Sequence, residues 1–209
     1  MDGTLINSIA SAERIWSAWA TRHGVDVASF LPTVHGVRTV ETINRLRLPG
    51  VDAEREAIEL AAAEIADVAG IVAVPGALAF VRALPPDRWA IVTSASRALA
   101  TARLTAVGVP IPAVLVTAED VTAGKPDPSS YQLAARKLGF DAADCVVFED
   151  APAGILAGEA ACAEVIVVTA THAHPFVTPH VAIASYDDLT ARVEDDGRVA
   201  LTLKGAHGR

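Results

Sequence analysis

Between residues 74 and 184 the sequence alternates short apolar runs with segments of helical periodicity. Strands are predicted at residues 89–93, 113–117, 145–148, 164–169 and 181–184, and helices at 75–84, 97–107, 128–138 and 153–160. The runs are apolar throughout, rather than at every second residue, which is typical of a parallel sheet covered by helices on both faces. The pattern therefore predicts an α/β fold with a Rossmann-like parallel sheet as its core.

The segment from Ser8 to Gly70 interrupts this alternation, because its apolar residues recur every three or four positions. Helices are predicted at residues 9–23, 39–47 and 53–69. We expect residues 1–7 and 71–196 to form the α/β core, residues 8–70 an inserted α-helical cap, and residues 197–209 a C-terminal tail with weak strand character at 199–203. A helical insertion directly after the first loop of the core is placed to act as a lid.

The composition excludes several classes of protein. With 209 residues, 52% of them hydrophobic and 20% charged, the chain is expected to be globular. A net charge of −8 argues against nucleic acid or a membrane surface as a partner. The apolar stretch 57–74 contains three acidic residues, so it is not expected to span a membrane. Two cysteines in no metal-binding spacing, and a first motif at residue 2, predict a cytoplasmic protein; the oligomeric state is left open.

Polar residues stand next to the predicted strands or in Gly/Pro turns at four places along the chain. They are Asp2 to Thr4, Thr93-Ser94, Lys125 and Glu149-Asp150. In an open α/β sheet such positions gather at the carboxyl edge, where ligands bind. A hydroxyl, an ammonium and several carboxylates around one cavity are groups that hold a phosphate and a divalent cation.

These segments resemble the four motifs of the haloacid dehalogenase superfamily, and most of all its sugar phosphatases with a helical (C1-type) cap. The resemblance rests on Asp-Gly-Thr-Leu at 2–5, the strand ending at Thr93, Gly-Lys-Pro-Asp-Pro at 124–128 and Phe-Glu-Asp-Ala-Pro-Ala-Gly at 148–154, and it extends to about Leu203. The first motif of that family reads Asp-x-Asp-Gly-Thr, with Met1 here at x. The resemblance therefore places the nucleophilic Asp and the first core strand upstream of Met1, between the strands ending at Thr93 and Phe148.

The resemblance implies a role for each core residue that matches a motif. Asp2 is the acid and base, with its backbone carbonyl on the metal; Thr93 and Ser94 bind the phosphate; and Lys125 neutralises phosphate and nucleophile. The competing interpretations are a mobile terminal acid for Asp2, a common strand-end Thr for Thr93 and a solvated surface lysine for Lys125.

The adjacent carboxylates Glu149 and Asp150 are expected to bind Mg²⁺, since two like charges at the end of a buried strand are costly without a cation. Asp150 is the more direct ligand, and Glu149 binds directly or through water. The alternative for Asp150 is the N-cap of the helix that follows.

In the cap, His35 and Arg38 flank Gly36 and are expected to contact the non-reacting part of the substrate; a surface loop is the competing interpretation. Trp16 and Trp19 are predicted to form the core of the cap. Three histidines are assigned to surface loops: His172, His174 and His180.

The function that follows is a Mg²⁺-dependent phosphatase for a small sugar or polyol phosphate, acting through an aspartyl-phosphate. Its partner is a small phosphorylated metabolite, and which one is left open. One alternative is a phosphotransferase similar to β-phosphoglucomutase, but Ala12 stands where that family has the His of its proton shuttle. A second alternative is a truncated, non-catalytic protein that binds a phosphorylated ligand.

Overall fold

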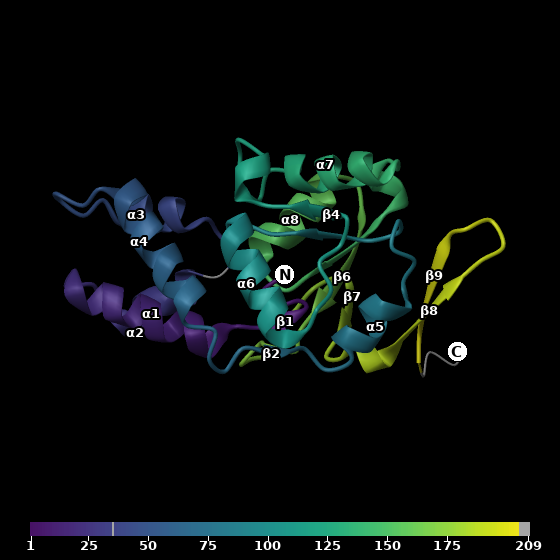
Figure 1. Ribbon diagram of the computed structural model, residues 1–209, viewed down its shortest axis with the longest axis horizontal. Coiled ribbons are helices and arrows are strands. Elements are labelled where there is room, and N and C mark those ends of the chain that lie inside the picture. Colours follow the sequence, from purple (N-terminus) through teal and green to yellow (C-terminus); the bar gives the residue numbers. More distant parts are fainter. Residues whose placement is uncertain (35, 205–209) are drawn as a thin grey trace.

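The computed structural model describes residues 1–34 and 36–204. Figure 1 shows three regions along the longest axis: a helical cap at the left, an α/β core in the middle and a β-hairpin at the right. The chain begins in the middle of the core, leaves it for the cap and then returns. Within the described residues, no helix is both long and apolar enough to cross a membrane.

The core contains two groups of parallel strands, as expected for the predicted α/β fold. β3 (Ala90–Val92) pairs with β4 (Val114–Val116), and β6 (Glu164–Val168) lies between β5 (Val146–Glu149) and β7 (Val181–Ile183). The middle strand is the most deeply buried, since four of its five residues are at most 5% exposed. All five strands lie at their predicted positions within two residues, so the parallel sheet core is confirmed.

Three helices of the core connect consecutive strands from β3 to β6: α6 (Arg97–Val107), α7 (Ser129–Leu138) and α8 (Pro152–Ala160). A fourth, α5 (Ala77–Ala83), precedes β3. The α6 helix begins with a Ser96 hydroxyl that accepts the Leu99 N–H at 3.3 Å, and it ends at a left-handed Gly108. Four short 3-10 turns complete the chain: Leu31–Thr33, Ala118–Asp120, Ala142–Asp144 and Tyr186–Asp188.

The cap consists of α1 (Ile9–Arg22), α2 (Val27–Phe30), α3 (Thr39–Leu46) and α4 (Ala53–Ala66). Its core is aromatic, because the rings of Trp16, Trp19 and Phe30 pack with centroids 5.5–5.7 Å apart. The prediction that both tryptophans form the cap core is confirmed. The α4 helix ends earlier than predicted, at a capping Asp67 whose carboxylate is bound by Arg14 at 2.9 Å.

Two short strands join the cap to the core. β1 (Ile6–Asn7) and β2 (Val72–Ala73) run antiparallel, with Ile6 opposite Ala73. The chain therefore enters and leaves the cap through one hydrogen-bonded ribbon. The sequence did not reveal this ribbon, since two residues are too few for a periodic pattern.

The C-terminal part departs from the predicted tail. β8 (Leu189–Val193) and β9 (Val199–Leu203) form an antiparallel hairpin, so the expected boundary at residue 197 falls in its turn. The weak strand signal at 199–203 was correct, but its partner strand was missed because Thr190 and Arg192 interrupt the apolar run. The last residues of the predicted tail, 205–209, lie outside the described part.

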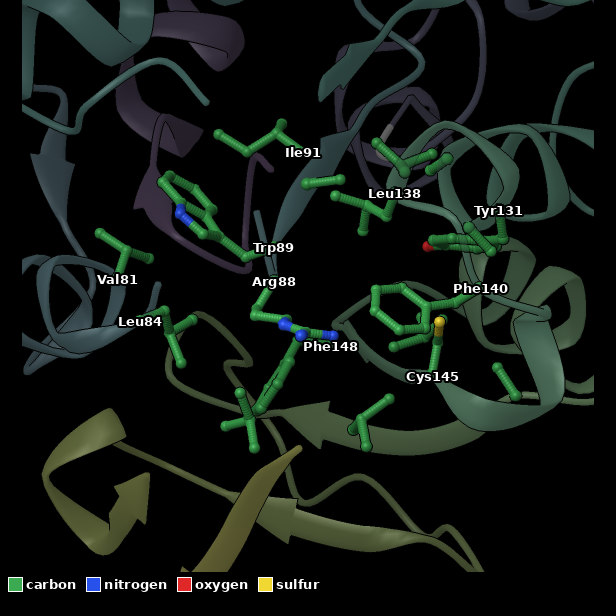
Figure 2. Close-up of a pocket in the computed structure, with 18 of the residues that line it drawn as sticks. Val81, Leu84, Arg88, Trp89, Ile91, Tyr131, Leu138, Phe140, Cys145 and Phe148 are labelled. Atoms are coloured by element: carbon green, nitrogen blue, oxygen red, sulfur yellow. The ribbon is translucent and has the colours of Figure 1, made fainter. Parts of the chain in front are cut away.

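A cavity of about 760 Å³ lies between β3 and β5. Among the described strands, β3 pairs only with β4 and β5 only with β6, so each has an unpaired edge. Mostly apolar side chains point into the space from both sides, including Ile91, Trp89 and Phe148 (Figure 2). Met1 is 7% exposed and lines the same cavity. This is the place where the resemblance puts the first core strand.

We expect an N-terminal extension that continues from Met1 into this cavity as an apolar strand to stabilise the protein strongly. Each backbone hydrogen bond formed with β3 or β5 contributes about 0.5–1.5 kcal/mol. A gain of about 5 kcal/mol would raise the Tm by roughly 10–20 °C in a chain of this size. The measurement is the Tm of residues 1–209 with and without about ten added residues. An equally long Gly/Ser extension is the control, and an equal Tm for both extensions would contradict the prediction.

Candidate active site

The first loop of the chain packs against the end of β5. Its turn is closed by the Leu5 N–H, which donates to the Met1 carbonyl at 2.8 Å. Gly3 has a φ of +71°, and a Cβ at this position would lie 1.8 Å from an oxygen of Asp150. The Thr4 hydroxyl donates to the other oxygen of that carboxylate at 2.9 Å. Glycine and threonine in this loop are therefore what bring the Asp150 carboxylate into contact with it.

Asp2 is held in place, which excludes the interpretation as a mobile terminal acid. Its Oδ1 accepts from the Ser8 hydroxyl at 2.6 Å and from Nη1 of Arg103 at 2.8 Å. The second guanidinium nitrogen of Arg103 donates to Glu64 at 3.0 Å. Burial raises the pKa of Glu64 above its ordinary value, although the charge of Arg103 opposes this. Neither the contacts of Ser8 and Arg103 with Asp2 nor the pairing of Arg103 with Glu64 was predicted from the sequence.

Lys125 is buried and bound to Glu149, so it is not a solvated surface lysine. Its Nζ and the Tyr131 hydroxyl both donate to Oε1 of Glu149. The backbone N–H groups of Asp150 and Ala151 approach Oε2 at 3.0 and 3.4 Å. Burial opposes ionisation of Glu149, yet the Lys125 ammonium and the hydrogen bonds hold its pKa at about 2.

The role of Glu149 as a metal ligand stays a prediction: its hydrogen bonds compete with direct binding and leave binding through water open. Both of its oxygens already accept hydrogen bonds, and a cation would have to displace the Lys125 ammonium or the backbone donors. The carboxylate fixes the direction of Lys125. Tyr131, which shares this oxygen, was not identified from the sequence, where it stands on an ordinary amphipathic helix.

Among the carboxyl groups of the site, Asp150 has the largest upward shift of its pKa, which favours its protonated form. Burial, and then the neighbouring Glu149 carboxylate, raise its pKa to about 7. Asp150 does not cap α8, because the N-cap of that helix is Ala151 and no side chain caps it. The ring of His172 lies 2.8 Å from the Asp150 carbonyl, so this histidine contacts the site instead of belonging only to a surface loop.

Thr93 ends β3 and is 7% exposed. Its N–H donates to the Val116 carbonyl at 2.9 Å, and its hydroxyl oxygen accepts the Ala95 N–H at 3.1 Å, so the side chain has one fixed direction. The hydroxyl of Ser94 donates to the carbonyl of Gly36 in the cap at 3.3 Å. Ser94 therefore links the core to the cap loop.

A pocket of about 100 Å³ lies where these residues meet, between cap and core. It contains the six core residues that the sequence predicted, together with side chains from the cap and from α6. Its main polar lining is Asp2, Ser8, Glu64, Thr93, Ser94, Arg103, Lys125, Glu149 and Asp150. Pockets for organic ligands usually measure about 300–1,000 Å³, so the cap in this structure closes over the site.

The two residues of the cap that were predicted to contact the substrate are Arg38 and His35. Arg38 donates to three carbonyls of the core, those of Ala118, Val121 and Thr122, at 2.7–3.0 Å. The guanidinium therefore fastens the cap to the core, and it does not line the pocket as the substrate-contact prediction required. The backbone direction that decides this was not readable from the local sequence. His35, the other predicted contact, lies outside the described residues.

The residues present suit Mg²⁺, although within residues 1–34 and 36–204 no three His, Cys, Asp or Glu side chains cluster tightly enough to hold a metal. Mg²⁺ needs only one or two carboxylates, because waters and phosphate oxygens complete its coordination. Asp150 is a hard oxygen donor whose raised pKa reflects burial beside another carboxylate. A cation next to Asp150 would lower the free-energy cost of its ionised form.

Comparison with known proteins agrees with this geometry. Residues 1–161 match the family of haloacid dehalogenase-like hydrolases. Hexitol phosphatase A of Escherichia coli (strain K12) is 39% identical over 210 residues, covering 96% of this chain and 95% of that protein. Validoxylamine A 7'-phosphate phosphatase of Streptomyces hygroscopicus subsp. limoneus is 36% identical, with 82% and 84% covered. A crystal structure of a hydrolase from Pseudomonas syringae has a TM-score of 0.71 and 28% identity, with 80% and 81% covered.

The pKa of Asp150 predicts how stability depends on pH. Because it is raised from 3.8 to about 7 in the folded chain, the folded state binds more protons than the unfolded state between these values. The stability from this group is therefore lost as the pH rises through about 7. In metal-free buffer we expect a lower Tm at about pH 8.5 than at about pH 5.5, by roughly 2–4 °C per kcal/mol lost.

Asp150→Asn serves as the comparison. Its amide cannot ionise, so the part of the fall in Tm with pH that Asp150 causes should vanish. Mg²⁺ added at about pH 8.5 should raise the Tm of the unchanged protein and leave that of the variant where it was. Identical pH profiles for the two proteins would show that Asp150 is not the group responsible.

Proposed function

Since the chain belongs to the haloacid dehalogenase-like hydrolases, we propose that it is a Mg²⁺-dependent phosphatase of a small sugar or polyol phosphate. The observation that carries this proposal is the convergence of Asp2, Thr93 and Lys125 with Asp150 on one closed pocket. An ammonium and a hydroxyl suit a phosphoryl group, and the carboxylates suit proton transfer and a cation. The name of the E. coli relative, a hexitol phosphatase, supports a polyol as the alcohol part.

Phosphate binding falls to Lys125 and Thr93. The ammonium of Lys125 is aimed by Glu149 and lies 4.9 Å from the centre of the Tyr131 ring, so it meets a phosphoryl oxygen with little loss of side-chain freedom. The Thr93 hydroxyl keeps its proton available, because its oxygen accepts the Ala95 N–H. Two fixed donors on the pocket wall stabilise the charge that develops on the phosphoryl oxygens.

Asp2 transfers protons. Its carboxyl gives a proton to the leaving oxygen of the substrate and then takes one from the water that releases the phosphate. The nucleophile that forms the aspartyl-phosphate belongs to the first family motif, two positions before Asp2. Tests of activity therefore use a chain extended upstream of Met1 by residues that include this Asp.

Asp150, with the backbone carbonyl of Asp2, is the set of donors proposed to hold Mg²⁺. The ion supplies positive charge next to the phosphoryl oxygens. The hydroxyl of Thr4 and the close approach of Gly3 keep the Asp150 carboxylate in one orientation for this role.

Two other functions fit the site less well than a phosphatase does. A mutase-like phosphotransferase needs a second proton-transfer group in the cap, but the cap residue at the matching position, Ala12, lines the pocket with a methyl group. A non-catalytic phosphate-binding protein would keep Lys125 and Thr93 and release no phosphate. Measured phosphate release separates this alternative from the proposal.

The test is a panel of phosphate esters given to the extended chain with Mg²⁺. We expect hydrolysis of polyol and sugar phosphates, and a loss of about 10²–10³-fold in kcat/KM for Lys125→Ala, because one preorganised donor at the reacting group contributes that much. Lys137→Ala, which removes an exposed lysine that pairs with Asp120, is the control and should leave kcat/KM unchanged. Phosphate binding without release would favour the non-catalytic alternative.

Arg38→Ala tests the corrected role of that residue. Losing three hydrogen bonds between cap and core should weaken closure, so kcat/KM should fall about equally, by roughly tenfold, for a polyol phosphate and for p-nitrophenyl phosphate. The measurement is the ratio of the two kcat/KM values in the variant and in the parent. A change in that ratio would restore the earlier expectation that Arg38 contacts the substrate.

A further inference from the structure

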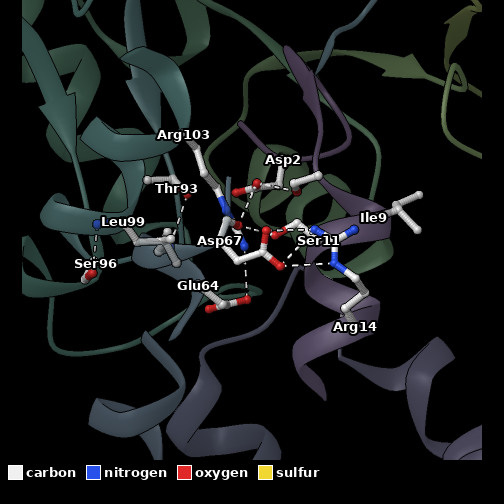
Figure 3. Close-up of polar contacts among 12 residues, drawn as sticks. Asp2, Ile9, Ser11, Arg14, Glu64, Asp67, Thr93, Ser96, Leu99 and Arg103 are labelled. Carbon is white, nitrogen blue, oxygen red and sulfur yellow. Dashed lines mark hydrogen bonds and ion pairs between the residues drawn. The ribbon is translucent and has the colours of Figure 1, made fainter. Parts of the chain in front are cut away.

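Arg103 joins two carboxylates that belong to different regions of the molecule. The residue lies on α6 of the core, and its guanidinium binds Asp2 of the first loop at 2.8 Å. With its other terminal nitrogen it binds Glu64, on α4 of the cap, at 3.0 Å. Figure 3 shows Arg103 between the two acidic side chains. The three residues form a continuous polar chain from the cap to Asp2.

This arrangement is deeply buried at its centre, since the side chains of Arg103 and Glu64 are each 6% exposed. A buried ion pair is a poor way to gain stability, because apolar residues of similar size often stabilise a fold as well. The pair does restrict geometry, since a guanidinium that serves two carboxylates has one orientation. Because the pair lies between cap and core, it fixes the position of one relative to the other.

The contact at Asp2 restricts which oxygen can carry a proton. Ser8 and Arg103 both donate to Oδ1, at 2.6 and 2.8 Å, and Oδ2 accepts no hydrogen bond from the described residues. A carboxyl held in this way keeps its proton on Oδ2, because an acceptor of two donated hydrogen bonds is the less basic oxygen. Arg103 and Ser8 thus orient the acid that the proposed reaction needs.

Glu64 connects this orientation to the position of the cap. A pocket of about 100 Å³ is too small for a sugar phosphate, so the cap must open for substrate to enter. The cap helices α1 and α4 are tied together near the hinge, because Asp67 accepts from Ser11 through its carbonyl and from Arg14 through its carboxylate (Figure 3). A cap that swings on the β1–β2 ribbon would carry Glu64 away from Arg103.

We propose that Glu64 and Arg103 are positioning residues that couple closure of the cap to the orientation of Asp2. This inference rests on the proposed phosphatase function. In the open state Arg103 loses its second partner and is free to turn. Closure returns Glu64 to Arg103, fixes the guanidinium and thereby sets Asp2 for proton transfer.

The kinetic test uses Glu64→Gln in the extended chain, with Glu59→Gln as the matched control on the same helix, where Glu59 pairs only with exposed Arg55. An acid oriented less well matters most for a substrate whose leaving oxygen needs a proton. We expect kcat for a polyol phosphate to fall about tenfold or more, with KM little changed, and kcat for p-nitrophenyl phosphate to fall less than about threefold. Arg103→Lys, which keeps the charge but not the fork, should show the same selective loss.

The second measurement does not depend on activity. Amide hydrogen exchange at Ile6–Asn7 and Val72–Ala73 reports opening at the hinge. In Glu64→Gln this exchange should be roughly five- to thirtyfold faster than in Glu59→Gln, and the increase should exceed any increase in the core strand Glu164–Val168, where exchange requires unfolding. Equal exchange in both variants, or equal kinetic losses on both substrates, would overturn the coupling. No phosphate release from any ester, with faster exchange in Glu64→Gln, would instead refute the proposed function and leave the cap contact established.

Discussion

A single buried carboxylate, Glu149, organises the site. It binds Lys125 and Tyr131 through one oxygen and the backbone at Asp150 through the other. A Cβ on Gly154 would lie 2.1 Å from its carboxyl carbon, so the helix that follows needs glycine there. Two segments of the chain, residues 125–131 and 149–154, thus meet at one charge. Without that charge, Lys125 would be a buried cation with no partner, which is among the costliest defects in a protein.

The charges around the pocket support the proposal that a cation binds there. The lining holds four carboxylates (Asp2, Glu64, Glu149 and Asp150) against two basic side chains (Lys125 and Arg103). Each basic group is already paired, one with Glu149 and the other with Asp2 and Glu64. A phosphate ester would add further negative charge to this space. Burial and then the Glu149 carboxylate raise the pKa of Asp150, and a divalent cation beside it would favour its ionised form.

The sequence revealed the residues whose position follows from the ends of strands. Thr93 and Asp150 were predicted because parallel strands end at one edge of a sheet. Lys125 was predicted because it stands between Gly124 and Pro126 in a turn. Arg103 left a readable signal, since it shares a helix face with the buried Leu99 and Leu104. Its partner was not readable: Glu64 is 39 positions away, on a helix with several similar glutamates.

Two arginines, Arg38 and Arg103, make contacts between cap and core, and they bind different kinds of group. Arg38 reaches from the cap to backbone carbonyls, which are neutral and keep their place whatever state the chemistry is in. Arg103 reaches from the core to two carboxylates, and one of these belongs to Asp2, the residue proposed to transfer protons. Contacts with backbone carbonyls can strengthen closure, but they do not touch Asp2. Ser8, at the start of cap helix α1, binds the same oxygen of Asp2 as Arg103 does. Under the proposal, these two contacts make the orientation of Asp2 depend on the position of the cap.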